Sequence, residues 1–111
     1  MHIETIVVGM SFYPNRGDFL LEKESRWEGE NGHVSYRINN ELTLKRESDN
    51  KYDEHAVAVL MDGEKIGYIN KEDAEEVSEE MDGGIKVKVE AHPLLVMKKN
   101  IPAYIILRLY T

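Results

Sequence analysis

The sequence predicts a mainly β fold with one short helix, a small barrel of the OB or SH3-like kind with about six strands. Short runs of β-branched and aromatic residues recur along the chain, and turn-forming residues separate them. Only residues 71–81 show an apolar stripe at helical spacing, with Ala74, Val77 and Met81 at i, i+3 and i+7. Many short strands with little helix favour a barrel, because it leaves few unpaired strand edges.

Length and composition indicate one folded domain over residues 1–111. The chain has the usual size of a single domain, and 41% of its residues are hydrophobic. It contains no cysteine, which excludes a disulfide framework or a thiolate zinc site and is typical of a reducing compartment. Its apolar runs are far shorter than the ~20 residues of a membrane helix, and residues 1–4 do not resemble a signal peptide. We therefore expect a cytoplasmic protein that does not enter a membrane.

Three strands are expected in the N-terminal half, at residues 3–13, 33–38 and 41–47. They are rich in β-branched and aromatic residues or alternate between polar and apolar ones. Residues 14–17 supply turn chemistry after the first strand. Residues 17–40 form an excursion from the barrel, which we expect to be structured because it contains large apolar side chains. These are Phe19, Leu20, Leu21 and Trp27.

A hairpin is the most distinct local feature of the C-terminal half. Residues 56–61 are apolar on both alternating sets, which is typical of a central strand that is covered on two sides. Asp62 and Gly63 then predict a type I′ turn, because both central residues of that turn need positive φ. Residues 64–69 are the partner strand.

A short helix is expected directly after the hairpin, at residues 71–81. Asn70 is a suitable N-cap, and Asp73 stands where the second residue of a capping box is found. Gly83 and Gly84 follow the helix and are expected to end it.

Two further strands are expected after the helix. Residues 85–92 alternate between apolar and charged side chains, as a half-buried strand does, and residues 94–97 extend it beyond Pro93. Residues 101–110 form the last strand.

The charge distribution bears on nucleic-acid binding. The formal net charge is −7, which argues against a protein that wraps a duplex, because phosphate binding relies on clustered Lys and Arg. Residues 71–82 carry seven acids and one lysine, a net charge of −6, whereas residues 83–111 carry five bases and one acid, a net charge of +4. Since the negative charge is concentrated in the predicted helix, a small DNA-binding pocket elsewhere is compatible with the composition.

The most specific pattern of the sequence runs from residue 44 to residue 74. It consists of an Arg-Glu pair, a loop with Asn, Tyr and Asp, an Ala-Val-x-Val strand, and a Gly-Tyr strand that leads into the helix. Its residues are Leu44, Arg46, Glu47, Asn50, Tyr52, Asp53, Ala56, Val57, Val59, Ile66, Gly67, Tyr68, Ile69 and Ala74. This order resembles the HIRAN domain, and Gly9 with Phe12 and Tyr13 is similar to the first strand of that family. The resemblance implies a β-barrel module that holds the end of a single DNA strand.

Residues 50–53 form the centre of the implied site. Asn50 and Asp53 have side chains that can bond their own backbone, so both can simply brace the loop while Tyr52 packs over the barrel end. The resemblance instead implies that Tyr52 stacks on a base, which is worth ~1–3 kcal/mol, and that Asp53 accepts a hydrogen bond from a free 3′-hydroxyl. A carboxylate in this place also repels an internal phosphate, which favours a strand end.

Further aromatic and basic residues complete the implied site. Tyr68 is either a core aromatic or part of the pocket, and Phe12 and Tyr13 extend the aromatic set. Lys71 is either a solvated lysine or a phosphate contact, together with the amides of the helix N-terminus.

The chain departs from the family pattern at one basic position. Ser11 stands where the family has an Arg before its aromatic pair, which removes one phosphate-binding cation. Lys45 and Arg46 are candidates to replace it, with Arg46 and Asn50 as secondary contacts of the site. Arg46 can also simply pair with Glu47 within the fold.

The sequence contains no motif for catalysis, a metal or a cofactor, so we expect a binding module and not an enzyme. It has neither a phosphate loop nor a nucleophile motif. Four histidines, His2, His33, His55 and His92, lack the spacing of metal ligands. The alternative function is a protein-interaction module, in which the acidic helix or the segment around Trp27 docks a helicase or nuclease partner.

Overall fold

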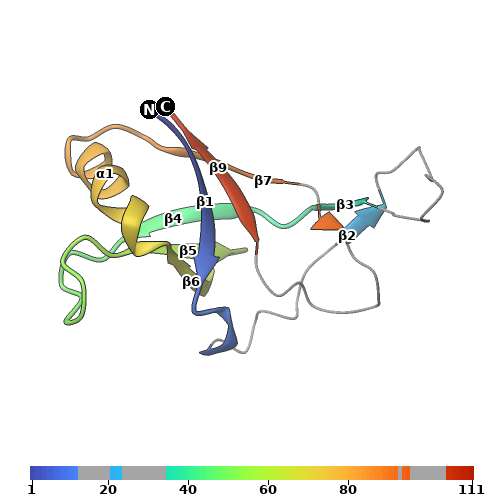
Figure 1. Cartoon of the computed structure of the whole chain (residues 1–111), viewed down its shortest axis with the longest axis horizontal. Helices are drawn as coiled ribbons and strands as arrows, with labels where there is room; N and C mark the ends of the chain where they lie inside the picture. The colour runs from blue at the N-terminus through green and yellow to red at the C-terminus, as the bar shows by residue number, and fades with distance from the viewer. Residues whose placement is uncertain (13–20, 24–34, 93, 96–104) are drawn as a thin grey trace.

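The computed structural model describes residues 1–12, 21–23, 35–92, 94–95 and 105–111 of the chain (Figure 1). Within this part of the chain the β-strands form two sheets, and one α-helix, α1 (Lys71–Asp82), lies at one end of the larger sheet. The predicted mainly β architecture with a single helix is therefore confirmed. No helix among the described residues is long and apolar enough to span a bilayer.

The larger sheet is a nearly closed antiparallel barrel. Its strands are β1 (His2–Val8), β4 (Leu42–Arg46), β5 (Val57–Met61), β6 (Glu64–Ile69), β7 (Lys88–Ala91) and β9 (Ile106–Tyr110). The strand order is β4-β5-β6-β1-β9-β7. The edge strands β4 and β7 come close to each other without pairing, so the barrel stays open along one seam.

The first strand is shorter than the sequence predicts. A strand is expected over residues 3–13, but β1 ends at Val8, and Met10–Phe12 form a short 3-10 helix, η1. Gly9 between them has a φ of +78°, a left-handed conformation that ends the extended backbone. Tyr13 lies outside the described residues.

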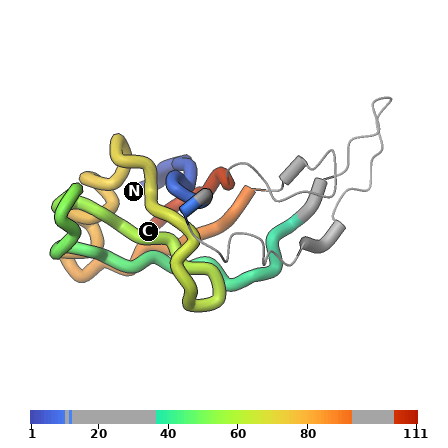
Figure 2. The backbone as a smooth tube through the Cα atoms, turned by 90° about the horizontal axis from the view of Figure 1, so that it is seen from below, coloured from blue at the N-terminus to red at the C-terminus, as the bar shows by residue number. Residues whose placement is uncertain are grey.

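The predicted excursion contributes to a second, three-stranded sheet. In it β3 (Ser35–Ile38) pairs with β2 (Leu21–Lys23) on one side and with β8 (Leu94–Leu95) on the other. The prediction that residues 94–97 extend the preceding strand is wrong for Leu94 and Leu95, because they pair with β3 instead. Both views show β3 leading away from the end of the barrel that carries α1 (Figures 1 and 2). Trp27 lies outside the described residues.

The hairpin between β5 and β6 confirms the predicted turn. Asp62 and Gly63 both have positive φ, 51° and 86°, as a type I′ turn requires. The Asp62 carboxylate also accepts hydrogen bonds from Asn40 Nδ2 at 2.8 Å and from the Glu41 N–H at 2.9 Å. The bond from Asn40 has the larger effect, and together the two bonds hold the pKa of Asp62 below its ordinary value. They also tie the turn to the start of β4.

The helix begins and ends close to the predicted residues. Asn70 caps it, because Asn70 Oδ1 accepts a hydrogen bond from the Glu72 N–H at 3.4 Å. Asp73 does not complete a capping box; its carboxylate accepts a hydrogen bond from Thr5 Oγ1 at 2.7 Å. Since Thr5 is buried on the inner face of β1, this bond fastens α1 to the barrel.

Branched aliphatic side chains fill the barrel interior. α1 contributes Ala74 and Val77, which are buried as the helical spacing predicts. β7 begins at Lys88, three residues later than predicted, and Ile85 is 48% exposed because it lies before the paired part of the strand. The barrel strands contribute Val7, Val57, Val59, Met61, Ile66, Ile69, Leu107 and Leu109 to this core cluster.

Candidate nucleic-acid interface

The loop between β4 and β5 is held in shape by its own polar side chains. Asn50 Oδ1 accepts hydrogen bonds from the backbone N–H groups of Tyr52 at 2.9 Å and Asp53 at 3.1 Å. Asp53 Oδ1 in turn accepts one from the His55 N–H at 2.9 Å. The bracing role of Asn50 and Asp53 is therefore confirmed. It leaves Oδ2 of Asp53 without a hydrogen bond among the described residues.

Two aromatic side chains project into solvent beside this loop and at η1. Tyr52 is 93% exposed and Phe12 is 85% exposed. Tyr52 therefore does not pack over the barrel end, which was one of its two expected placements. Figure 1 shows the loop (light green) at one end of the barrel and η1 (blue) below β6. Each of the two rings is therefore available for stacking on a ligand.

Tyr68 lies on the outer face of the barrel. It stands opposite Val8 of β1 on one side and Ala58 of β5 on the other. Its ring is half-buried, and its hydroxyl donates a hydrogen bond to Glu47 Oε1 at 2.8 Å. Tyr68 is therefore not a core aromatic, and it connects β6 to the base of the loop that follows β4.

An ion pair between Glu47 and Lys65 lies at the base of the same loop. Lys65 Nζ pairs with Glu47 Oε2, donates to the Tyr68 hydroxyl at 3.1 Å and stands 5.0 Å from the centre of the Tyr68 ring. Burial raises the pKa of the Glu47 carboxyl, but hydrogen bonds from Lys65, Tyr68 and Asn50 outweigh it and hold that pKa below its ordinary value. The bond to Glu47, followed by the bond to Tyr68, raises the pKa of Lys65. Both groups are therefore charged at neutral pH.

Arg46, predicted as a secondary contact, is occupied by interactions within the fold. Its Nε donates to Asp82 Oδ1 at 3.0 Å and its Nη2 to Asp82 Oδ2 at 3.3 Å. Nη1 and Nη2 also donate to the carbonyls of Ala56 at 3.1 Å and Glu54 at 2.6 Å. Its partner is thus Asp82 at the end of α1 and not Glu47, so Arg46 clamps the loop to the helix.

The other predicted residues are placed only in part. Lys71 is exposed in the first turn of α1, directly after the β6 strand that carries Tyr68. Lys45 is exposed on β4, opposite Ala58. Tyr13 and the side chain of Ser11 lie outside the described residues.

The sequence was compared with models of known protein families. A model of the HIRAN domain matches residues 1–93 of the chain. The chain belongs to the HIRAN domain family. This family is known generally as a DNA-binding module that is not catalytic by itself.

A solved structure shares the fold of this HIRAN domain. The crystal structure of the HIRAN domain of human HLTF superposes with a TM-score of 0.58 at 22% sequence identity, and the match covers 97% of this chain and 72% of the human one. No curated protein sequence matches the chain.

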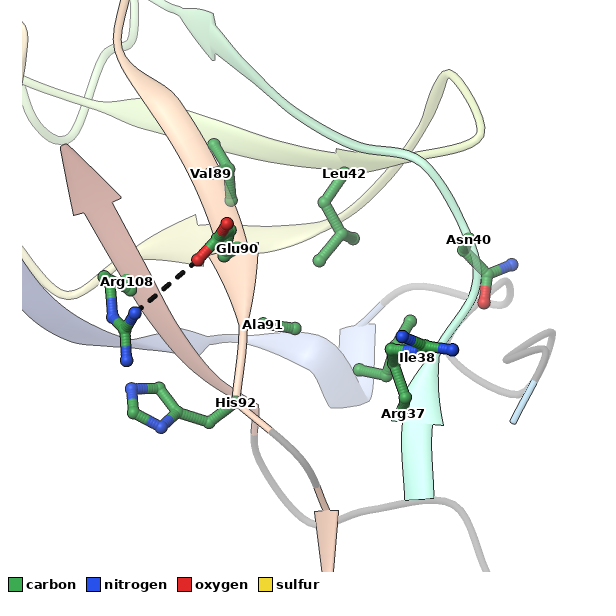
Figure 3. Close-up of a pocket in the computed structure, with 9 residues that line it drawn as sticks. All are labelled: Arg37, Ile38, Asn40, Leu42, Val89, Glu90, Ala91, His92 and Arg108. Atoms are coloured by element: carbon green, nitrogen blue, oxygen red, sulfur yellow. Dashed lines mark ion pairs between the residues drawn. The ribbon is translucent and has the colours of Figure 1, made fainter. Parts of the chain in front are cut away.

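Two cavities of this HIRAN domain lie away from the aromatic loop. The first, of about 420 Å³, has an apolar floor with Ile38 and Leu42 on one side and Val89 and Ala91 on the other (Figure 3). Its rim includes Arg108, whose Nη1 lies 3.6 Å from Glu90 Oε2 (Figure 3). The second, of about 710 Å³, follows the open seam between β4 and β7. Among the described residues, none of those predicted to contact nucleic acid lines either cavity.

Sequence reasoning missed Lys65 and assigned Glu47 to the wrong partner. Lys65 follows the Asp62-Gly63 turn by two residues, and a lysine in that place is typically solvated. No local pattern distinguishes it, because its partner Glu47 comes from another strand end. The described residues contain no group of three or more side chains that could hold a metal ion.

Proposed function

We propose that this HIRAN domain binds single-stranded DNA at a free 3′ end, in a role linked to DNA repair or to the processing of replication forks. The observation that carries the proposal is the loop at residues 47–56, which is rigid at its base and presents Tyr52 almost fully exposed beside Asp53. A fixed loop loses little entropy when a ligand orders it, so its exposed groups are well suited to binding.

The exposed aromatic rings supply affinity that does not depend on sequence. A base that stacks on Tyr52 gains about 1–3 kcal/mol, and every base has a face that can do so. Phe12 and the outer edge of Tyr68 are proposed as further stacking positions, with Tyr13 as another proposed contact. These rings compensate in part for the missing Arg at Ser11.

Asp53 is the residue proposed to select a strand end. One carboxylate oxygen holds the loop through the His55 N–H, and the other accepts a hydrogen bond from a 3′-hydroxyl. A phosphate in the same place would meet a negative charge instead, which disfavours the interior of a strand. Lys71, exposed at the start of α1, is proposed to contact the adjoining phosphate.

A titration with matched oligonucleotides tests the proposal. Fluorescence anisotropy would compare one short single strand with a free 3′-hydroxyl and the same strand with a 3′-phosphate. We expect the free end to bind about tenfold more tightly, as one hydrogen bond to a charged group implies. Equal affinity for the two strands, or no binding at low salt, would refute it.

Two variants with the same change of charge test whether Asp53 is responsible for the preference for a free 3′ end. Asp53→Asn keeps the acceptor for the His55 N–H but should bring the ratio of the two affinities close to one. Asp49→Asn removes an exposed acid of the same loop and should leave the ratio unchanged. Tyr52→Ala should weaken binding of both strands by about 5- to 150-fold, the loss of one stacked base.

The second candidate function is docking of a helicase or nuclease partner. It is favoured by the outward face of α1, where Glu72, Glu75, Glu76 and Glu79 are all exposed and would repel DNA. Replacing these four residues by Gln should leave strand-end binding intact and abolish capture of a basic partner. If strand-end binding fell by tenfold or more, the helix would belong to the DNA site.

A further inference from the structure

We propose that Glu47 determines the specificity of the strand-end site, because its carboxylate holds Tyr68 and the Asn50 loop together while it neutralises Lys65. The inference rests on the proposed function of the same site. It assigns Glu47 a positioning role and makes no claim that it touches DNA.

Glu47 occupies the point where the loop leaves the barrel. Its N–H donates to the Ala56 carbonyl at 2.9 Å, which closes the base of the loop one residue beyond β4. Its side chain is only 14% exposed, so it faces the network and not the solvent. A carboxylate in this position is costly unless donors surround it.

Three donors do surround that carboxylate. Oε1 accepts hydrogen bonds from the Tyr68 hydroxyl at 2.8 Å and from Asn50 Nδ2 at 3.2 Å, and Oε2 pairs with Lys65. The bond from Nδ2 fixes the Asn50 amide with its Oδ1 toward the N–H groups of Tyr52 and Asp53. A change at Glu47 is therefore passed through Asn50 to both residues that are proposed to bind the strand end.

The same carboxylate controls a positive charge beside the proposed stacking surface. Lys65 Nζ lies 5.0 Å from the centre of the Tyr68 ring, and its side chain is 31% exposed. An unpaired ammonium in that place would attract any phosphate of a single strand and add one sequence-independent contact. Paired with Glu47, it adds none, so the preference for a strand end is not diluted by binding along the backbone.

Glu47→Gln separates the charge from the shape of the site. Its amide oxygen can still accept from Tyr68 and Asn50, but Lys65 loses its counter-charge. We expect tighter binding of the strand with a 3′-phosphate, a salt dependence of log K steeper by about 0.7 for the one added phosphate contact, and a smaller ratio between free and blocked ends. Asp49→Asn is the matched control, because it removes one exposed acid of the same loop and should change none of these three quantities.

Glu47→Asp tests positioning alone. The shorter side chain keeps the negative charge near Lys65 but withdraws the acceptor from Tyr68 and Asn50. The salt dependence should stay that of the wild type, while affinity for the free 3′ end should fall about tenfold, the loss expected for a misplaced charge-assisted hydrogen bond. A role confined to folding would lower the melting temperature of both variants without steepening the salt dependence of Glu47→Gln.

The outcomes distinguish this inference from the function on which it rests. If the wild type fails to prefer a free 3′ end, the proposed function is wrong and the specificity role of Glu47 falls with it. If the wild type shows the preference and Glu47→Gln keeps both its ratio and its salt dependence, only the inference is overturned. If Glu47→Gln does not fold, Glu47→Asp decides, and wild-type affinity in that variant overturns the inference.

Discussion

Gly67 is the position where the barrel should tolerate substitution least. It lies in β6, and the C-terminal end of the neighbouring strand β1 packs directly against it. A Cβ added to Gly67 would stand 2.5 Å from the Val8 carbonyl oxygen and 2.6 Å from Val7 Cγ1. Distances under 3.0 Å essentially never occur for Cβ atoms, and the nearest neighbour is backbone, which cannot rotate away. Gly67→Ala therefore has to separate β1 from β6 by about 0.5 Å or more.

The free-energy cost of that separation depends on the pairing between β1 and β6. The strand register joins β1 and β6 through Val7 with Ile69 and Val8 with Tyr68, and both pairs directly follow Gly67 along β6. We expect Gly67→Ala to lower the free energy of unfolding by about 3 kcal/mol, in the range for an overpacked core position. For a domain of this size the melting temperature should fall by about 12 °C or more.

Equilibrium unfolding in urea, followed by circular dichroism, measures this loss. Gly83→Ala is the control, because Gly83 has a φ of −76° and a Cβ there would lie 3.4 Å from its nearest neighbour, the Glu79 carbonyl oxygen. The control should change stability by no more than about 0.5 kcal/mol. If Gly67→Ala proved as stable as Gly83→Ala, the close approach of β1 and β6 would be wrong.

Three further substitutions test the contacts that position the site. Arg46→Met should lower the free energy of unfolding by about 2–3 kcal/mol, and Arg46→Lys should not restore it, because an ammonium cannot make the two bonds to Asp82. Urea unfolding of both variants measures this, and wild-type stability of Arg46→Lys would contradict the role of Arg46 as a clamp. Asn70→Ala should cost about 0.5–1 kcal/mol and reduce helical ellipticity, and a neutral result would show that the cap contributes nothing. The pKa of Glu47 is lowered from 4.5 and that of Lys65 raised from 10.5. The stability difference between wild type and Glu47→Gln should therefore be constant from about pH 5.5 to 9.5 and shrink as the pH falls below 4.5 and Glu47 becomes protonated. Urea unfolding at each pH measures it, and a difference that stays the same at every pH below 4.5 would contradict the pairing.

The predicted elements that proved correct depend on short-range rules. The Asp62-Gly63 turn follows from the φ angles of two residues, and the position of α1 follows from its cap and its apolar spacing. The family pattern from residue 44 to 74 is likewise a local sequence of strand, loop, hairpin and helix. Patterns of this kind can be assigned before the chain is folded, because each residue's role is set by its neighbours in sequence.

The predictions that failed concern pairing between distant segments. Leu94 and Leu95 have the same composition whether they continue one strand or join β3, and only the pairing of β3 decides between the two. Asp73 could cap the helix or bind Thr5, and the short distance between α1 and β1 selects Thr5. Arg46 pairs with Asp82, which is 36 residues away in sequence, because the end of α1 lies beside the loop.

The sequence by itself determined the family, the barrel class and the identity of Tyr52, Asp53 and Lys71 as the groups to consider. The tertiary structure alone decided how these groups are held and what surrounds them. It left Tyr52 in solvent, engaged Arg46 within the fold, and brought Lys65 and the Tyr68 hydroxyl to the Glu47 carboxylate. The physical reason is that a side chain's exposure, charge state and hydrogen-bond partners depend on which strands pair across the barrel, and strand pairing joins residues that the linear order keeps apart.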